Sequence, residues 1–137
     1  MAEVLGKLLI TTARPFCAGV DIVVVPVPLH RRRLWDRGFN QAELLARVVA
    51  QELAYPLVAP LTRRVPTRPQ FNLSRRDRRA NIAGAFAMKP RGREQINHKI
   101  VLLVDDIVTT GATMNECAKI LKQNGAREIW GLVLAKA

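Results

Sequence analysis

The sequence has 137 residues, of which 49% are hydrophobic, and a formal net charge of +11. This length suits a single domain, residues 1–137, and the apolar content excludes disorder for most of the chain. The longest apolar runs, residues 22–29 and 54–61, contain prolines and are too short to cross a bilayer, which needs about 20 residues. The N-terminus does not resemble a signal peptide, so we expect a cytoplasmic protein without a membrane span.

The positive charge is concentrated in the middle of the sequence. Residues 31–93 contain 15 basic and four acidic residues, whereas the rest of the chain contains seven of each. A neutral scaffold that carries a cationic segment indicates an anionic ligand, namely phosphate, pyrophosphate or nucleic acid. The two cysteines and two histidines show no metal-type spacing, so we expect reduced thiols and no metal site built from them.

The first half of the chain predicts two helices and a buried strand. An apolar stripe predicts a helix over residues 2–13, and a β-branched run predicts a buried strand over 21–28 whose two prolines end its pairing. A basic loop follows over 30–38. Helical spacing then predicts a helix over 39–53, capped by Asn40 and stopped by Pro56, before a short edge strand within 57–64.

The second half predicts a strand–helix–strand unit. Residues 66–73 are expected to form a mobile loop, 74–82 a short basic helix, 85–88 a short strand and 90–98 a polar loop. Buried strands are predicted over 99–105 and 128–134, joined by a helix over 113–124 that ends at Gly125 in the left-handed conformation. Such a unit is right-handed and parallel, so the fold class is α/β with a parallel core sheet.

The most informative segment covers residues 101–113, where an apolar strand runs into two acids and a loop rich in threonine. Ligands of parallel α/β sheets bind at the carboxyl ends of strands. The loop precedes a helix, so its backbone N–H groups, its hydroxyls and the helix dipole form a cradle for a phosphate. The two carboxylates suit the cis hydroxyls of a ribose, with a metal ion nearby. The residues concerned are Asp105, Asp106, Thr109, Thr110, Gly111, Ala112 and Thr113.

This segment resembles the signature of type I phosphoribosyltransferases, which bind phosphoribosyl pyrophosphate. Residues 25–33, 37–46, 68–70, 73–81 and 84–86 further resemble the ComF/GntX group of bacterial competence and DNA-utilisation proteins. The resemblance covers about residues 20–135 and implies the type I fold with a flexible basic hood loop. Members of the group usually begin with a small zinc ribbon, for which these residues hold no counterpart.

The resemblance also implies a role for each segment. Asp105 and Asp106 would be the catalytic pair that contacts the ribose hydroxyls, residues 109–113 would hold the 5′-phosphate, and Mg²⁺ would be bound through the substrate. Residues 66–80 would form the hood that closes over the site. The pyrophosphate loop would include Leu29, His30, Arg31 and Arg37, and the hood would contribute Arg68, Gln70 and Arg75.

Two functions are compatible with these features. The chain could be an enzyme that transfers a phosphoribosyl group to an unknown nucleophile, with Mg²⁺. Alternatively, it could be a non-catalytic competence module that senses the same ligand while its basic segment binds single-stranded DNA or a helicase partner. Fold alone does not decide between them. The arginines at 75–79 cover more than one helix face, so some of them are plain surface, and a homo-oligomer is compatible with either function.

Overall fold

The fold is known from a computed structural model that describes residues 21–29, 35–36, 38–64 and 82–137. The predicted helix at 2–13, loop at 66–73 and basic helix at 74–82, except for the last residue of that helix, lie outside these ranges. A three-stranded sheet, in the order β1-β4-β5, forms the centre of the described part. Its strands are β1 (Ile22–Pro26), β4 (Ile100–Val108) and β5 (Glu128–Lys136), and both pairings are parallel, as predicted.

Strand β1 is buried along its whole length, because it is an unbroken apolar run between two layers of helix. Its ladder with β4 runs from the Ile22–Ile100 pair to the Pro26–Val104 pair. One further hydrogen bond follows, in which the Val27 amide donates to the Val104 carbonyl at 2.9 Å. The prediction that pairing stops near the prolines is confirmed.

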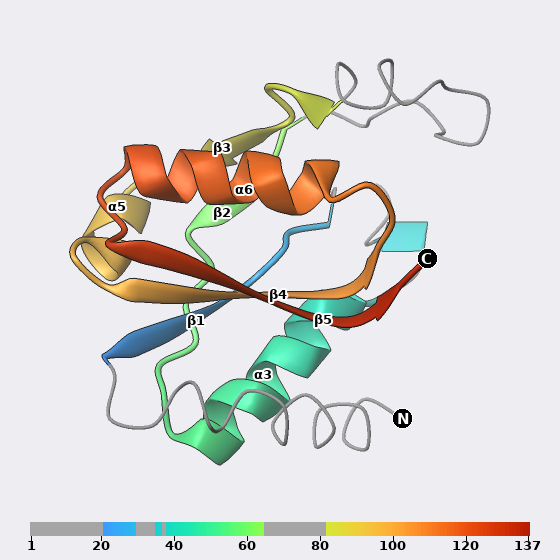
Figure 1. Ribbon diagram of the computed structural model, residues 1–137, viewed down its shortest axis with the longest axis horizontal. Helices are drawn as coiled ribbons and strands as arrows, with labels where there is room; N and C mark the ends of the chain where they lie inside the picture. Colours follow the sequence, from blue (N-terminus) through green and yellow to red (C-terminus); the bar gives the residue numbers. More distant parts are fainter. Residues whose placement is uncertain (1–20, 30–34, 37, 65–81) are drawn as a thin grey trace.

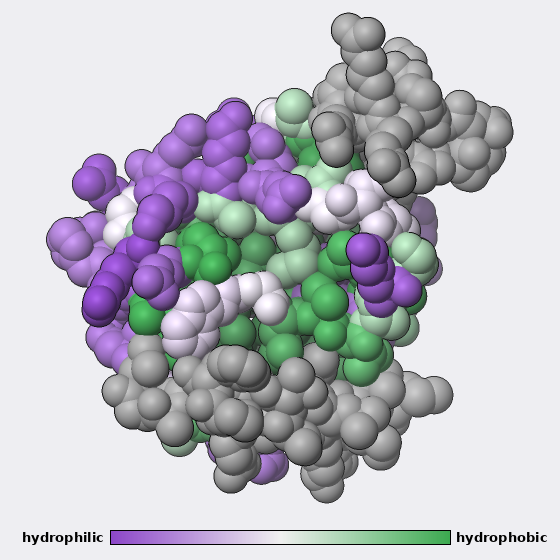
Figure 2. Space-filling model, viewed as in Figure 1, coloured by the Kyte–Doolittle hydropathy of each residue, from purple (hydrophilic) through white to green (hydrophobic). Residues whose placement is uncertain are grey.

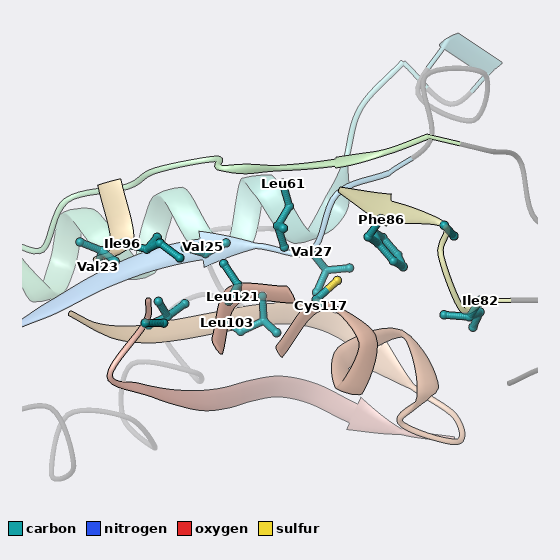
Figure 3. Close-up of a cluster of buried hydrophobic side chains, with 13 residues drawn as sticks. Val23, Val25, Val27, Leu61, Ile82, Phe86, Ile96, Leu103, Cys117 and Leu121 are labelled. Atoms are coloured by element: carbon teal, nitrogen blue, oxygen red, sulfur yellow. The ribbon is translucent and has the colours of Figure 1, made fainter. Parts of the chain in front are cut away.

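Helices α3 (Gln41–Leu53) and α6 (Ala112–Gln123) cover opposite faces of the sheet (Figure 1). The two faces follow from the alternation of side chains along each strand. Ile22 and Val24 of β1 pack with α3 in one hydrophobic cluster. The alternate residues of β1 pack on the other face with Cys117 and Leu121 of α6, as Figure 3 shows.

Both long helices have the ends that the sequence predicts. Asn40 caps α3, since its side chain accepts a hydrogen bond from the Ala42 amide at 3.1 Å. The helix ends at Leu53, before Pro56. At the end of α6, Gly125 has a φ of +102°, which is the left-handed conformation expected of a residue just beyond a helix.

The region around residues 57–64 differs from the prediction of one edge strand. Leu57 forms an isolated parallel bridge with Val24 of β1, and a separate strand, β2 (Leu61–Arg63), follows. Strand β2 pairs antiparallel with β3 (Phe86–Met88), which confirms the short strand predicted at 85–88. The segment is divided because its first part extends the edge of the main sheet and its second part forms a small ribbon.

Three further predictions need correction. The predicted loop at 90–98 contains a short helix, α5 (Gly92–Ile96), which is too short to show helical periodicity but buries Ile96 completely. Strand β4 continues three residues beyond its predicted end, because β5 still pairs with it there, up to Val108 opposite Lys136. Strand β5 was predicted as a core strand, but it is an edge of the described sheet, and Leu132 is its one buried residue.

The surface on the side of α6 reflects this layering. Figure 2 shows hydrophilic residues gathered over the outer face of α6 and hydrophobic residues below it, where β5 crosses the view. No helix within the described residues is long and apolar enough to cross a membrane.

Candidate functional site

The carboxyl ends of β1 and β4 and the N-termini of α3 and α6 meet at one end of the sheet, to the right in Figure 1. A cavity of about 220 Å³ opens there. This is the end at which parallel α/β sheets bind ligands. The described residues that line the cavity are Val27, Pro28, Leu29, Asn40, Gln41, Arg63, Asp105, Asp106, Ile107, Thr109 and Thr113.

The two predicted acids both line this cavity from strand β4. The Asp106 amide donates a hydrogen bond to the carboxylate of Asp105 at 2.9 Å, and the Ile107 amide donates to the carboxylate of Asp106 at 2.9 Å. Each carboxylate is therefore held by the amide of the next residue. Their remaining lone pairs are available to accept hydrogen bonds from hydroxyl groups of a ligand.

Burial raises the pKa of Asp105 from its usual value near 4 to about 7. A hydrogen bond with the Asp106 side chain and the charge of that residue also raise this pKa, whereas the hydrogen bond from the Asp106 amide and the positive charge of Arg63 lower it. The Asp105 carboxyl therefore gains or loses its proton near neutral pH. A ligand that brings a cation or hydroxyl donors would favour the ionised form.

The threonine-rich loop begins helix α6, as predicted. Gly111 has a φ of +82°, and its carbonyl accepts a hydrogen bond from the Asn115 amide at 2.9 Å. The Thr110 hydroxyl accepts from the Ala112 amide at 3.3 Å. The loop encloses a second cavity of about 40 Å³, lined by residues 107–114 together with Ile82 and Asp105. All five predicted residues of 109–113 thus lie at one helix N-terminus, where an anion is stabilised.

The sequence analysis did not identify Arg63 as a site residue. This residue ends β2, and its side chain lines the central cavity with the two acids. Its guanidinium lies 5.2 Å from the centroid of the Phe86 ring, which is a cation–π distance. The available signal was weak, because a basic residue near an edge strand is common on any protein surface.

Asn40 has a larger role than the predicted cap. Its amide nitrogen donates to the carbonyl of Val27 at 3.2 Å, while its oxygen caps α3. It therefore fastens the carboxyl end of β1 to the start of the helix, and it lines the central cavity beside Gln41. Its place within residues 37–46, one of the segments that carry the family resemblance, was the signal that could have indicated this role.

The other predicted site residues are only partly placed. Leu29 lines the central cavity, in agreement with its position at the start of the predicted pyrophosphate loop. No group of three or more His, Cys, Asp or Glu side chains able to hold a metal ion occurs among the residues that the structure describes. The remaining predicted residues, His30, Arg31, Arg37, Arg68, Gln70 and Arg75, lie outside the described ranges.

A parallel sheet with paired acids at a strand end and a threonine-rich loop at a helix start characterises a class of phosphoribosyl-binding domains. Residues 40–137 match the phosphoribosyl transferase domain family, and the chain belongs to this family. This finding confirms the resemblance that the sequence motifs indicated.

Among curated proteins, the chain is similar to proteins named for competence and DNA utilisation. It is 41% identical over 115 residues to Competence protein F of Haemophilus influenzae, with 82% of this chain and 50% of that protein covered. It is 39% identical over 114 residues to DNA utilization protein YhgH of Escherichia coli K12, with 80% and 48% covered. The chain thus spans about half the length of these relatives.

Solved structures show the same fold at low sequence identity. Purine phosphoribosyltransferase from Pyrococcus horikoshii is 17% identical, with a TM-score of 0.59 and coverage of 98% of this chain and 72% of that one. A hypoxanthine phosphoribosyltransferase from Staphylococcus aureus is 15% identical, with a TM-score of 0.60 and coverage of 99% and 72%. The predicted α/β fold of the type I phosphoribosyltransferases is therefore confirmed.

Proposed function

We propose that this chain binds phosphoribosyl pyrophosphate with Mg²⁺ and transfers the phosphoribosyl group to a nucleophile. One observation carries the proposal: Asp105, Asp106 and the loop at the start of α6 line the same cavity. Carboxylates accept hydrogen bonds from the two ribose hydroxyls, and the loop N–H groups hold the 5′-phosphate. A single sugar phosphate can use both features, because they adjoin each other along the chain.

The donor set fits a magnesium ion that is held mainly by the substrate. Mg²⁺ prefers oxygen ligands and is commonly bound through one or two carboxylates together with substrate phosphates. Asp105 and Asp106 supply two carboxylates at the cavity wall. When bound, the ion would offset the negative charge of the pyrophosphate.

In the proposed reaction, the bonds that form and break lie in the substrate and the nucleophile, and the residues of the chain bind and orient them. The nucleophile forms a bond to C1 of the ribose, the bond from C1 to the pyrophosphate oxygen breaks, and pyrophosphate leaves with the electron pair. Positive charge develops on the ribose as this bond breaks, and the carboxylates of Asp105 and Asp106 stabilise that charge through the hydroxyls they hold. Because the two ribose hydroxyls and the 5′-phosphate are all held, C1 of the sugar is also positioned for attack by the nucleophile.

Isothermal titration calorimetry with phosphoribosyl pyrophosphate tests the proposal. We expect binding in the presence of Mg²⁺, much weaker binding in EDTA, and loss of binding in the Asp105→Asn/Asp106→Asn double variant. Asp21→Asn is the matched control, since Asp21 is an exposed carboxylate just before the amino end of β1, away from the cavity. Equal affinity in the wild type and the double variant would contradict the proposed binding of the ribose by Asp105 and Asp106.

A second candidate function is a binding module for single-stranded DNA. It is favoured by the net charge of +11, which falls within residues 31–93, and by the names of the relatives, which refer to competence and DNA utilisation. Because phosphate contacts release counterions, such binding would be weak, independent of sequence and strongly dependent on salt.

Fluorescence anisotropy with a labelled oligonucleotide tests this candidate. If the arginines at 75, 76, 78 and 79 bind DNA, replacing them with serine should weaken DNA binding and flatten its salt dependence, while the affinity for phosphoribosyl pyrophosphate stays intact. If they only line the hood, the same variant should lose affinity for phosphoribosyl pyrophosphate instead, with DNA binding absent or unchanged. Those four arginines lie outside the described residues. Absence of wild-type DNA binding even at low salt would remove this candidate.

A further inference from the structure

Strand β5 is the last strand of the main sheet, and no strand among the described residues pairs with its outer edge. The amides of Arg127 and Ala137, which flank β5, donate to the carbonyls of Lys99 and Val108 on the β4 side, both at 2.8 Å. Successive residues of a strand direct their N–H and C=O groups alternately to its two sides. The even-numbered residues of 128–136 therefore direct theirs away from β4, to the open edge.

The sequence of β5 lacks the features that usually protect such an edge. Exposed edges are commonly kept from pairing by short strands, by prolines or by charged side chains along the strand. This strand has nine residues, and those between its two charged ends are Ile, Trp, Gly, Leu, Val, Leu and Ala. Figure 2 shows hydrophobic residues at the surface where β5 crosses the view. The edge is therefore suited to pairing with another strand.

The charges at the two ends of β5 select the partner and the register. Glu128 begins the strand and Lys136 ends it, and both side chains are exposed. If two copies of β5 pair antiparallel and are centred on Leu132, Glu128 of each copy lies opposite Lys136 of the other. A shift of two residues in either direction leaves each charge opposite an uncharged residue or beyond the strand. We propose that β5 pairs in this register with β5 of a second copy of this chain, which joins the two main sheets into one.

The backbone groups and the apolar side chains fit the same register. Every even-numbered residue lies opposite an even-numbered residue, so the N–H and C=O groups that point outward from the two copies meet. Trp130, Leu132 and Leu134 all pack with the cluster on the α3 side of the sheet. In the proposed pair, Leu132 meets its own copy at the twofold axis, and Trp130 lies opposite Leu134 of the second copy. Cross-strand pairs of apolar side chains and of opposite charges stabilise a sheet, and the symmetry forms each unequal pair twice.

The Glu128 side chain is already held on the required face. Its carboxylate accepts a hydrogen bond from Nε1 of Trp130, two residues along the strand, at 3.0 Å. Alternate residues of a strand share a face, so both side chains lie on the side where Lys136 of the second copy would be. The carboxylate retains a second oxygen to accept from the ammonium group.

Reversal of the end charges tests the proposal, with the dissociation constant of the dimer measured by analytical ultracentrifugation of the full chain over a hundredfold range of concentration. Glu128→Lys and Lys136→Glu should each weaken dimerisation at least tenfold, because each places like charges opposite each other at both ends of the pairing. The double variant Glu128→Lys/Lys136→Glu forms both pairs again with the charges exchanged. It should return to within threefold of the wild type.

The two single variants also control for net charge. Glu128→Lys raises the charge of +11 and Lys136→Glu lowers it, so an effect of overall repulsion would move the two dissociation constants in opposite directions. Arg64→Glu is the matched control for Lys136→Glu, because Arg64 is exposed and follows β2, outside the main sheet. It should dimerise as the wild type does.

Amide hydrogen exchange followed by NMR identifies the edge directly. The amides of Trp130, Leu132 and Leu134 should exchange rapidly in dilute protein and slowly in concentrated protein. The amides of Ile129 and Val133, which face β4, should be protected at both concentrations. Circular dichroism of each variant confirms that the exposed substitutions leave the fold intact.

A wild type that stays monomeric at every concentration overturns the proposal, and this is the result expected if another part of the same chain covers the edge. A dimer whose dissociation constant neither charge reversal changes overturns it as well. Neither Glu128 nor Lys136 lines the central cavity or the cavity at the start of α6. Binding of phosphoribosyl pyrophosphate is therefore a separate measurement, and failure of the dimer does not contradict the proposed function.

Discussion

The backbone amide of Asp106 donates a hydrogen bond to the carboxylate of Asp105, its neighbour on β4, at 2.9 Å. This contact holds two acids side by side at the wall of one cavity, where their charges repel each other. The hydrogen bond from the amide favours the ionised carboxylate, but burial together with the side chain and charge of Asp106 outweighs it and raises the pKa of Asp105 to about 7. The pair therefore reduces its repulsion by keeping a proton near neutral pH.

The raised pKa of Asp105 predicts a specific dependence of stability on pH. The folded state binds the proton more tightly than the unfolded chain, whose aspartate pKa is about 3.9. The resulting stabilisation is complete below that value and is lost as pH rises through about 7. Asp105→Asn lacks this titration. The unfolding free energy of the variant minus that of the wild type should therefore rise between pH 5 and pH 8, by on the order of 2 kcal/mol for this partly exposed group.

Urea denaturation at pH 5, 6, 7 and 8 measures this difference. The control is Asp21→Asn, which leaves Asp105 in place and should keep the pH slope of the wild type. A difference between Asp105→Asn and the wild type that stays constant across the four pH values would contradict the elevated pKa.

The two hydrogen bonds of the Asn40 side chain predict a graded loss of stability. Asn40→Ala removes both the cap to the Ala42 amide and the bond to the Val27 carbonyl, so it should cost about 1–2 kcal/mol. Asn40→Asp keeps an acceptor for the Ala42 amide and loses only the donor to Val27, so its cost should be smaller. Urea denaturation at neutral pH ranks the three proteins, and equal stability of the wild type and Asn40→Ala would show that neither bond contributes.

Local sequence patterns predicted the main elements because the physical causes of those elements are local. The β-branched run before Pro26 and the apolar run before Asp105 form buried strands, and apolar spacing identified α3 and α6. The predicted end of β4 was wrong. Two consecutive acids indicated the residues that follow a strand, whereas pairing with β5 continues to Val108. The short helix α5 was missed because its burial depends on a single residue, Ile96.

The residues of the candidate site also fall into two groups, those that a local pattern reveals and those that only the folded chain brings together. Asp105, Asp106 and the loop at 109–113 are contiguous in the chain, so a motif reveals them together. Arg63 reaches the same cavity only because β2 pairs with β3 beside it and places the guanidinium over Phe86. That pairing joins residues far apart in the sequence, and no local pattern encodes it.

Cys117 should be unreactive in the folded protein. Its side chain is fully buried against the sheet, and burial raises its pKa to about 12, with the charge of Asp105 acting in the same direction. At pH 8 only about one thiol in 10,000 would be ionised, and the thiolate is the reactive form. In a Cys17→Ser variant, Ellman's reagent should react slowly with the native protein and at once in 6 M guanidinium chloride. A rapid reaction in native buffer would show that the residue is accessible.

The conformation of Gly111 predicts separate effects on stability and on binding. Its φ of +82° is unfavourable for a residue with a side chain, while the nearest atom to an added Cβ, Nδ2 of Asn115, is 3.7 Å away. Gly111→Ala should therefore cost about 1 kcal/mol through backbone strain rather than through a clash.

Relief of that strain would move the loop that begins α6, so Gly111→Ala should also weaken ribose 5-phosphate binding by at least fivefold in calorimetry. Gly84→Ala is the matched control, because Gly84 has a φ of +77°, has no atom within 4 Å of an added Cβ and lines neither the central cavity nor the cavity at the start of α6. It should lose a similar amount of stability and keep the wild-type affinity. The backbone strain is similar in the two variants, and only Gly111 lies where the phosphate is proposed to bind. Equal affinities in the two variants would therefore show that the loop at the start of α6 does not bind the phosphate.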